Sequence, residues 1–175
     1  MDFVLISNNA LTEKHLNDIG ALKAQHWPHP VSSQVDWILK NYNENDLHVI
    51  LDDNGFTAGY VALADLKVTF DGKNADALGI SCLCVDKNYQ GKGLGLLIME
   101  KAFKIAKEKN KTLCLLCKEK LVDFYKKCGY LILSPEKILV ADEIFNHNLM
   151  LCDNISNGET KALKSAKNIF IDRNF

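Results

Sequence analysis

A glycine-rich turn between an apolar strand and a helix has the composition of an anion-binding site. In Gln90-Gly91-Lys92-Gly93-Leu94-Gly95, three glycines fall at alternate positions. Glycine permits positive φ and has no Cβ, so a ligand can approach its backbone closely. Successive N–H groups at a helix N-terminus bind anions, and Lys92 adds positive charge. The turn predicts a phosphate or pyrophosphate ligand, although a tight strand–helix connection could also need these glycines.

Two common phosphate motifs do not fit this turn. A P-loop requires G-x-x-x-x-G-K-[ST], but Gly93 follows Lys92, and Asp86 stands where the first glycine should be. A dinucleotide fingerprint requires G-x-G-x-x-G, and its third glycine is replaced by Leu96. A nucleotide-triphosphate enzyme and a dinucleotide-binding domain are therefore disfavoured.

Two segments in order resemble the signatures of the GNAT superfamily of acetyl-CoA-dependent N-acetyltransferases. The first segment is Leu83-Cys84-Val85, which is followed after four residues by the glycine-rich turn. This order is similar to the family's motif, in which a strand is followed by [Gln/Arg]-x-x-Gly-x-[Gly/Ala] and a long helix. The second is Phe124-Tyr125-Lys126-Lys127-Cys128-Gly129-Tyr130, which resembles [Leu/Phe]-Tyr-x-x-x-Gly-[Phe/Tyr]. The core of the resemblance covers about residues 47–133.

The resemblance implies acetyl-CoA as cosubstrate and a role for each matching residue. The pantetheine arm would bind along the strand, and the pyrophosphate would bind the amides of the turn. Tyr125 would be the general acid for the departing thiolate, and the Val85 N–H is a candidate oxyanion donor. A core aromatic is the alternative for Tyr125. The implied cofactor-binding residues are Leu83, Cys84, Val85, Gln90, Gly91, Lys92, Gly93, Leu94, Gly95, Leu96 and Lys118.

The general base is not identified. An amine acceptor must lose a proton before it attacks the thioester. The family's glutamate near the start of the motif strand is replaced by Gly79, and Asp76 is the nearest acid. Ser81 or His48 could position a water molecule, although each could equally be structural.

The acceptor side is less well defined. In this family the segment between the first two helices borders the acceptor site, and here it is His26-Trp27-Pro28-His29-Pro30. Trp27 and His29 are therefore candidate substrate contacts, with a core anchor as the alternative for Trp27. A small-molecule primary amine is the expected acceptor, in preference to a protein. A catalytically impaired acyl-CoA-binding regulatory domain is the alternative function, because Gly79 removes the expected base.

The residue patterns and the resemblance predict a mixed α/β fold. The expected sheet is mostly antiparallel, with one parallel strand pair splayed around acetyl-CoA and helices on both faces. Strands are predicted at 4–6, 47–51, 56–63, 78–85, 113–116, 130–133 and 149–152, and helices at 12–26, 32–41, 94–109 and 119–128. Residues 1–153 form one expected domain. Residues 154–175 form an extension, weakly helical around 160–170, that could cover the cleft, make a homodimer contact or be disordered.

Composition limits the remaining classes. The 175 residues carry a net charge of −1 and 47% hydrophobic residues, as in an ordinary globular domain. Residues 92–127 carry +6 and the rest −7; this basic half either faces a polyanion or is a solvated helix surface. With one arginine and no aromatic–basic interleaving, no nucleic acid partner is expected. No membrane partner is expected either.

The N-terminal residues and the cysteines bear on localisation and metals. Met1–Ser7 lacks the basic n-region of a signal peptide, so a cytoplasmic protein is expected. Cys82, Cys84, Cys114 and Cys117 could be assembled into a thiolate site, but residues i and i+3 of a strand face opposite sides. Neither a metal site nor disulfides are expected.

Overall fold

The computed structural model describes residues 1–144, 147–152, 155 and 158–175. Within these residues the chain divides into two units. The first contains Met1–Ala64, Ser81–Ala102 and Phe175, and the second contains Asp65–Ile80 and Phe103–Asn174. The strands β3 (Phe56–Phe70) and β4 (Lys73–Val85) run through both units. Each unit has a buried core of its own, with Tyr60 and Ile19 in the first and Leu115 and Met150 in the second.

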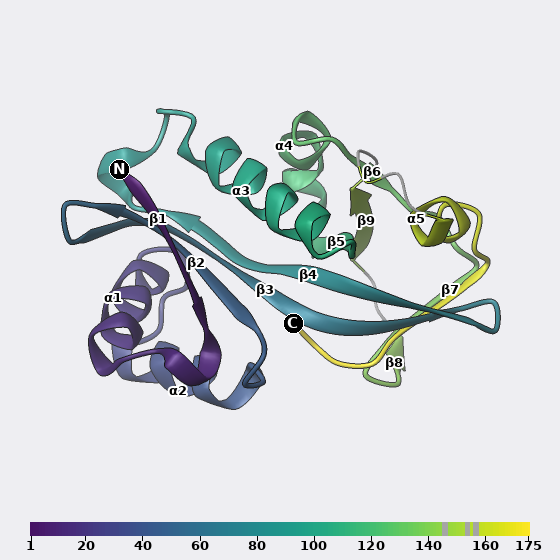
Figure 1. Cartoon of the computed structure of the whole chain (residues 1–175), viewed down its shortest axis with the longest axis horizontal. Coiled ribbons are helices and arrows are strands. Elements are labelled where there is room, and N and C mark those ends of the chain that lie inside the picture. The colour runs from purple at the N-terminus through teal and green to yellow at the C-terminus, as the bar shows by residue number, and fades with distance from the viewer. Residues whose placement is uncertain (145–146, 153–154, 156–157) are drawn as a thin grey trace. The chain divides into compact units, whose positions relative to one another are not determined.

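The first unit places an antiparallel sheet against two helices. Strand β1 pairs with β2, and β2 pairs with β3, in both cases antiparallel. A short 3₁₀ turn precedes α1, and another precedes the glycine-rich turn (Figure 1). The further elements are β1 (Asp2–Ser7), η1 (Asn8–Ala10), α1 (Glu13–Ala24), α2 (Val31–Asn41), β2 (Leu47–Asp53), η2 (Lys87–Tyr89) and α3 (Leu94–Glu108), which continues into the second unit.

Helices α1 and α2 cover one face of this sheet with apolar side chains. The apolar spacing of 12–26 correctly predicted α1, and Thr12 is its N-cap, accepting a hydrogen bond from the His15 amide at 3.3 Å. Ile19 and Leu22 are buried against side chains that project from β2, β3 and β4 on the same face. This cluster consists of Ile19, Leu22, Ile38, Tyr42, Ile50, Tyr60, Ala62 and Cys84. Their burial fixes α1 and α2 beside the end of β4.

The start of α3 packs on the opposite face of β3. A Cβ built on Gly59 would come within 2.6 Å of Ile98 Cδ1, and Ile98 is fully buried. Neighbouring residues of a strand point to opposite faces, so Tyr60 packs under α1 and α2 while α3 packs against Gly59. Glycine at position 59 thus permits the close approach of α3 to the sheet.

Two tight hairpin turns connect the long strands. Asn54 and Gly55 have φ values of 55° and 86°, and Asp71 and Gly72 have 45° and 77°. Two consecutive positive φ values are typical of a type I′ turn, which matches the twist of the flanking strands. The first turn joins β2 to β3, and the second joins β3 to β4.

The second unit contains the parallel strand pair. Ala77–Ile80 of β4 pairs in parallel with Thr112–Leu115 of β5, as the strand–helix–strand pattern of 78–116 predicted. β9 pairs antiparallel with β5 and β6, and β10 pairs antiparallel with β3 and parallel with β7. The further elements are β5 (Thr112–Cys117), η3 (Glu119–Leu121), α4 (Val122–Lys127), β6 (Tyr130–Ile132), β7 (Lys137–Val140), β8 (Glu143–Ile144), β9 (Asn148–Cys152), α5 (Gly158–Leu163) and β10 (Asn168–Ile171).

Several boundaries differ from the sequence-based expectation. The strands expected at 56–63 and 78–85 belong to much longer strands that pass through both units. The weakly helical stretch expected around 160–170 is helical only to Leu163, and Asn168–Ile171 is a strand held by two neighbours. Strands β7 and β8 were not predicted. The domain boundary expected between residues 153 and 154 lies outside the described residues.

The architecture is a mixed α/β fold, as expected. The hydrogen-bonded strand order is β6-β9-β5-β4-β3-β10-β7-β8, with β2 also paired to β3 and β1 to β2. A second parallel pair, β7 with β10, adds to the one predicted. None of the helices in the described part of the chain is both long enough and apolar enough to cross a bilayer.

Replacing Gly59 with valine should lower the free energy of unfolding by about 1–3 kcal/mol, because the new side chain overpacks the contact with Ile98. Urea unfolding followed by circular dichroism measures this change. Gly158→Ala is the control, since a Cβ there meets no atom within 4 Å, and its effect should stay within about 0.5 kcal/mol. Equal stability of the wild type and Gly59→Val would contradict the described packing.

Candidate active site

The glycine-rich turn has the left-handed backbone that its composition predicted. Gly91 and Gly93 have φ values of 75° and 78°, and α3 begins at Leu94 with Gly95 in its first turn. A Cβ built on either left-handed glycine meets nothing within 4 Å, so the space beside the turn is open. The first amides of a helix have no acceptor inside the helix, and the helix dipole makes them attractive to an anion. The turn therefore has the backbone geometry and open space that an anion site requires.

The residues that lead into this turn are hydrogen-bonded by side chains from segments distant in sequence. Asp86 accepts hydrogen bonds from the Gln25 side chain at 2.7 Å and from the Asn88 amide at 2.9 Å. The same two bonds, the one from Gln25 foremost, lower the pKa of the Asp86 carboxyl. Gln25 also accepts from the Lys87 amide at 3.1 Å. The C-terminal end of α1 is thus tied directly to the loop.

Lys92 is placed beside the turn by an aromatic contact. Its ammonium lies 4.9 Å from the centre of the Tyr89 ring. Tyr89 stacks on Phe56 and donates a hydrogen bond from its hydroxyl to Asp53 at 2.8 Å. The hairpin between β2 and β3 therefore supports a cation next to the predicted anion site.

Near the C-terminal end of β4, neighbouring residues differ in burial. Cys84 is buried in the cluster under α1 and α2, and burial raises the pKa of its thiol. Leu83 and Val85 are partly exposed. The Val85 carbonyl accepts hydrogen bonds from His26 Nε2 at 2.8 Å and from the Gln90 side chain at 3.3 Å. His26 was not singled out by sequence reasoning, and its role in fixing Val85 depends on a contact between distant segments.

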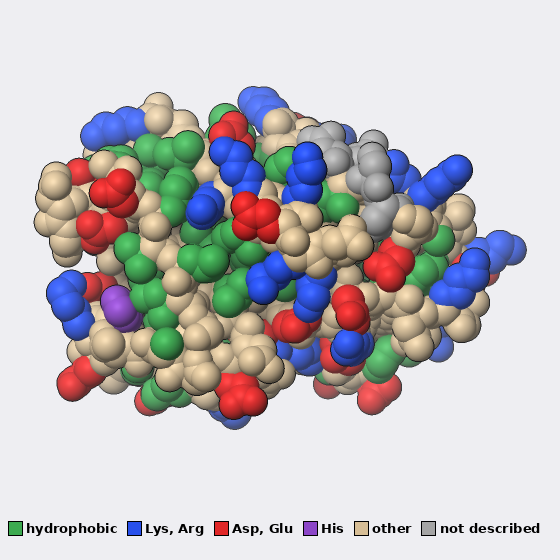
Figure 2. All heavy atoms as spheres, in the orientation of Figure 1, with side chains coloured by type: hydrophobic (Ala, Val, Ile, Leu, Met, Phe, Trp, Pro, Cys, Tyr) green, Lys and Arg blue, Asp and Glu red, His purple; other side chains and the backbone are tan. Residues whose placement is uncertain are grey.

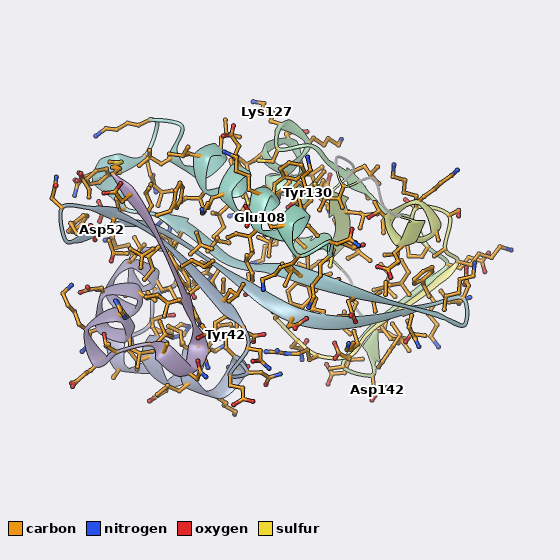
Figure 3. The ribbon with its side chains drawn as sticks, in the orientation of Figure 1. Tyr42, Asp52, Glu108, Lys127, Tyr130 and Asp142 are labelled. Atoms are coloured by element: carbon orange, nitrogen blue, oxygen red, sulfur yellow. The ribbon has the colours of Figure 1, made fainter. Side chains whose placement is uncertain are left out.

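A chain of buried polar groups lies on the same face of the sheet as Cys84. Tyr42, labelled in Figure 3, directly follows α2 and donates its hydroxyl hydrogen bond to Ser81 Oγ at 3.0 Å. Burial raises the pKa of Tyr42 and of Tyr60 well above the ordinary value for tyrosine. Ser81, a predicted water-positioning residue, is 7% exposed and bonded to protein.

His48 is neutral in this network, and its tautomer follows from its partners. Asn8 donates through Nδ2 to the Tyr42 carbonyl, so Asn8 Oδ1 faces His48 Nε2 at 3.0 Å. Nε2 must then carry the proton, and Nδ1 accepts from the Tyr60 hydroxyl at 2.7 Å. Burial lowers the pKa of His48 to about 4. These bonds describe a structural role for His48, which was one of the two readings of the sequence.

Lys23 and Cys82 lie together beside this network. The Lys23 side chain is 2% exposed, and its ammonium lies 3.9 Å from the centre of the Trp37 ring. Cys82 has φ of 54° within β4, a left-handed conformation that is unusual for a residue other than glycine. Sequence reasoning did not single out Lys23, although it stands four positions after the apolar Ile19 on the buried side of α1.

The segment between α1 and α2 is exposed. Trp27 is 38% exposed, so it is not the core anchor that the alternative reading proposed. Its carbonyl accepts from the Gln34 side chain at 3.1 Å, and its ring lies 6.0 Å from the Lys23 ammonium. His29 is exposed as well. Both candidate substrate contacts are therefore accessible from solvent.

The comparison with protein families decides the assignment of the chain. The model of the acetyltransferase (GNAT) family matches residues 16–130, which is more than half of the sequence. The chain belongs to the GNAT family. The resemblance inferred from the turn and from the Tyr125 segment is confirmed.

Solved structures support the GNAT fold. An aminoglycoside 6'-N-acetyltransferase complexed with coenzyme A is 14% identical, with a TM-score of 0.66 over 90% of this chain and 98% of that one. The ribosomal-protein-S18-alanine N-acetyltransferase from Escherichia coli is 18% identical, with a TM-score of 0.62 over 90% and 97%. The GNAT family N-acetyltransferase YhbS from Escherichia coli, in complex with CoA, is 16% identical, with a TM-score of 0.63 over 96% and 88%.

These likenesses extend to the fold and no further. No curated protein matches the chain by sequence. At identities this low, the neighbours show how the chain folds and leave the acceptor undefined. Acyltransferase chemistry with an acyl-CoA cosubstrate is the activity that the GNAT family supports in general.

The second GNAT signature lies in the second unit. Tyr125 is 8% exposed in α4, with its ring in edge contacts with Phe124 at 5.1 Å and Tyr130 at 6.1 Å. These contacts are those of a core aromatic, and the general-acid role of Tyr125 stays a prediction. Lys118, directly before the 3₁₀ turn Glu119–Leu121, is exposed.

Gly79 occupies the position expected for the GNAT glutamate. Gly79 is a buried position of β4 paired with Cys114. Asp76, the nearest acid in sequence, accepts a bond from the Lys67 ammonium at 2.6 Å, and this hydrogen bond lowers the pKa of its carboxyl. The Asp76 carboxylate is thus engaged at the surface of the second unit.

The side chains over α3 bear on the basic segment 92–127. Lysine and acidic side chains intermix over α3 on the face shown in Figure 2, which favours the interpretation of this segment as a solvated helix surface.

Among the described residues, no three His, Cys, Asp or Glu side chains form a group that could hold a metal ion, and none of the six cysteines forms a disulfide.

His48 should make stability fall as the pH is lowered. Its pKa is about 4 when folded, against an ordinary 6.5, so between these values the unfolded chain binds a proton that the folded chain does not. From about pH 7 to about pH 5, this histidine should remove about 2 kcal/mol from the free energy of unfolding.

Denaturant unfolding at both pH values tests this statement. The pH-dependent loss should be about 2 kcal/mol smaller in His48→Gln than in the wild type. The exposed His29 is the matched control, and His29→Gln should keep the wild-type dependence. An unchanged pH dependence in His48→Gln would show that His48 is not held neutral.

Proposed function

We propose that this chain is an N-acetyltransferase that transfers acetyl from acetyl-CoA to a primary amine by direct attack in a ternary complex. The observation that carries the proposal is the left-handed turn at Gly91 and Gly93, which opens α3 with unobstructed space beside it. Membership of the GNAT family supports an acyl-CoA ligand for this anion site.

The donor would bind along the end of β4 and the turn. The amides of residues 90–96 would receive the pyrophosphate, and the backbone of Leu83 and Val85 would bond the pantetheine arm as an added strand. Lys92, held over Tyr89, and the exposed Lys118 are proposed to meet the nucleotide phosphates. Cys84 would contribute its backbone, because its side chain is buried on the other side.

The protein must assist the reaction at three steps. The acceptor must lose a proton, the developing oxyanion needs a donor, and coenzyme A must leave as a thiol. The Val85 N–H is the proposed oxyanion donor, and Tyr125 the proposed acid. Ser81, bonded to Tyr42, is the candidate for positioning a water molecule.

The acceptor is proposed to be a small-molecule amine. Trp27 and His29 are exposed beside the C-terminal end of α1, where an apolar or aromatic acceptor could contact them. The similar structures include one named for an aminoglycoside and one named for an alanine of a ribosomal protein. Their names therefore do not choose between small-molecule and protein acceptors.

The alternative is a regulatory domain that binds acyl-CoA without turnover. Gly79, which stands where the family has its glutamate, is the observation that favours it. Release of coenzyme A thiol from acetyl-CoA in the presence of a library of primary amines separates the two functions. Amine-dependent release supports the enzyme, and tight acetyl-CoA binding with no release on any amine supports the regulator.

Gly93→Asp should abolish both acetyl-CoA binding and thiol release, because a side chain and a negative charge enter the pyrophosphate site. Isothermal titration calorimetry measures the affinity. Gly72→Asp is the matched control, since Gly72 is also left-handed with open space and lies in the β3–β4 hairpin, away from Lys92 in sequence. Its affinity should match that of the wild type. Unchanged affinity in Gly93→Asp would refute the proposed donor site.

A further inference from the structure

The ammonium of Lys23 is buried without a carboxylate partner among the described residues. Lys23, at the C-terminal end of α1, is 2% exposed, so its ammonium does not extend into water as that of a surface lysine does. In the described part of the chain, salt bridges are formed by Lys14, Lys67, Lys111 and Lys167, and Lys23 forms none. A buried charge is costly unless it is paired, and burial lowers the pKa of Lys23.

The buried carboxylates of the first unit are engaged elsewhere. Asp46 accepts a hydrogen bond from the Asn43 amide at 2.8 Å, and Asp86 accepts one from the Gln25 side chain at 2.7 Å. Neither carboxylate forms a salt bridge with Lys23. The negative charge that would compensate this ammonium is therefore left for a ligand to supply.

Two indole rings flank the ammonium. Lys23 Nζ lies 3.9 Å from the centre of the Trp37 ring and 6.0 Å from the centre of the Trp27 ring. Aromatic faces attract a cation but leave its charge uncompensated. Trp37 is 36% exposed and Trp27 is 38% exposed, so both side chains also reach solvent. A ligand that approaches the ammonium from solvent would therefore contact these rings.

The Trp27 ring is the more distant of the two, and the Trp27 backbone is held by bonds of its own. The Trp27 amide donates to the Lys23 carbonyl at 2.9 Å, and the Trp27 carbonyl accepts from the buried Gln34 side chain at 3.1 Å. The indole can therefore rotate about its side-chain torsions while the connection between α1 and α2 keeps its path. A rotation of this one side chain would admit an anion to Lys23.

Contacts within the first unit connect this ammonium to the strand that is proposed to bind the donor. The Trp37 ring, under which Lys23 lies, makes an edge contact with the Tyr42 ring at 5.4 Å between centroids. The Tyr42 hydroxyl donates to Ser81 Oγ at 3.0 Å. Ser81 stands two residues before Leu83, where the pantetheine arm is proposed to bind. The ammonium thus belongs to the same set of packed residues as the proposed site.

We propose that Lys23 binds a carboxylate of the acceptor, and that the acceptor is therefore an amino acid. This inference rests on the proposed function, which supplies the requirement for an amine. The carboxylate compensates the charge of the Lys23 ammonium through charge-assisted hydrogen bonds. The indole rings of Trp27 and Trp37 contact the apolar part of the acceptor.

The single charge of the site selects among amines. A carboxylate carries one negative charge and neutralises one ammonium, whereas a phosphate monoester carries nearly two and would leave an excess. A polyamine would bring further positive charge toward a buried cation, which disfavours its binding. An amine that also carries one carboxylate matches Lys23 on both counts.

Matched acceptors test this preference through thiol release from acetyl-CoA. Each amino acid of a library is compared with its carboxamide and with the amine that lacks the carboxyl group, such as phenylalanine with phenylalaninamide and phenethylamine. The fastest acceptor should be an amino acid. Its kcat/KM should be at least about tenfold above those of its two relatives, because only the carboxylate forms a charge-assisted bond with the buried ammonium.

Lys23→Met should remove this preference. The KM for the amino acid should rise about tenfold or more and approach that for its carboxamide, whereas a merely structural role of Lys23 would lower kcat with both acceptors. Methionine is apolar and similar in length, and circular dichroism checks the fold of the variant. Lys14→Met is the matched control, because Lys14 is an exposed lysine of the same helix, and it should keep the wild-type preference.

Tryptophan fluorescence gives a readout that needs no turnover. Trp27 and Trp37 are the two tryptophans of the chain, so its indole emission reports directly on the surroundings of Lys23. With coenzyme A present, the preferred amino acid should change this emission in a saturable manner, and its carboxamide at the same concentrations should not. Lys23→Met should lose the change, and Trp27→Phe should lose most of it.

Three results would overturn the assignment of Lys23 and leave the proposed function intact. They are a carboxamide or a simple amine as the fastest acceptor, an undiminished preference for the amino acid in Lys23→Met, and equal fluorescence changes with the amino acid and its carboxamide. Failure of the wild type both to bind acetyl-CoA and to release thiol with any amine would instead reject the proposed function itself.

Discussion

The left-handed backbone of Cys82 is the constraint that turns the end of β4 toward the cluster under α1 and α2. A regular strand would send Ser81 and Cys82 to opposite faces, because successive side chains of a strand alternate. With φ of 54° at Cys82, both side chains instead reach the buried cluster under α1 and α2. Cys82 then packs against this cluster beside Ser81, while β4 continues to Val85 and into the glycine-rich turn.

The packing of α1 ties this cluster to the anion site within the first unit. Ile19 and Leu22 fix the helix on the sheet, and residues at its C-terminal end then make separate contacts. Lys23 lies over the Trp37 ring, Gln25 holds Asp86, and His26 holds the Val85 carbonyl. One helix thereby orients both the approach to the turn and the end of β4.

The parts of the site that local sequence specifies were predictable. Gly91 and Gly93 require no distant contact to adopt positive φ, and Asn54-Gly55 and Asp71-Gly72 encode their turns directly. The contacts of Gln25 with Asp86 and of His26 with Val85 were not predictable, because these residues are far apart in sequence and meet only after α1 has packed on the sheet. The same holds for β10, whose pairing with β3 and β7 overrides a weak helical pattern. The absence of an acid at Gly79 could be recognised from the sequence.

The central claim is that the turn at Gly91 and Gly93 binds the pyrophosphate of coenzyme A. The most direct measurement compares the affinities of the wild type for coenzyme A and for pantetheine, which lacks the pyrophosphate and the nucleotide, by isothermal titration calorimetry. The account predicts that coenzyme A binds and that pantetheine binds at least about tenfold more weakly, a difference of about 1.4 kcal/mol. Equal affinities, or no binding of coenzyme A, would contradict it.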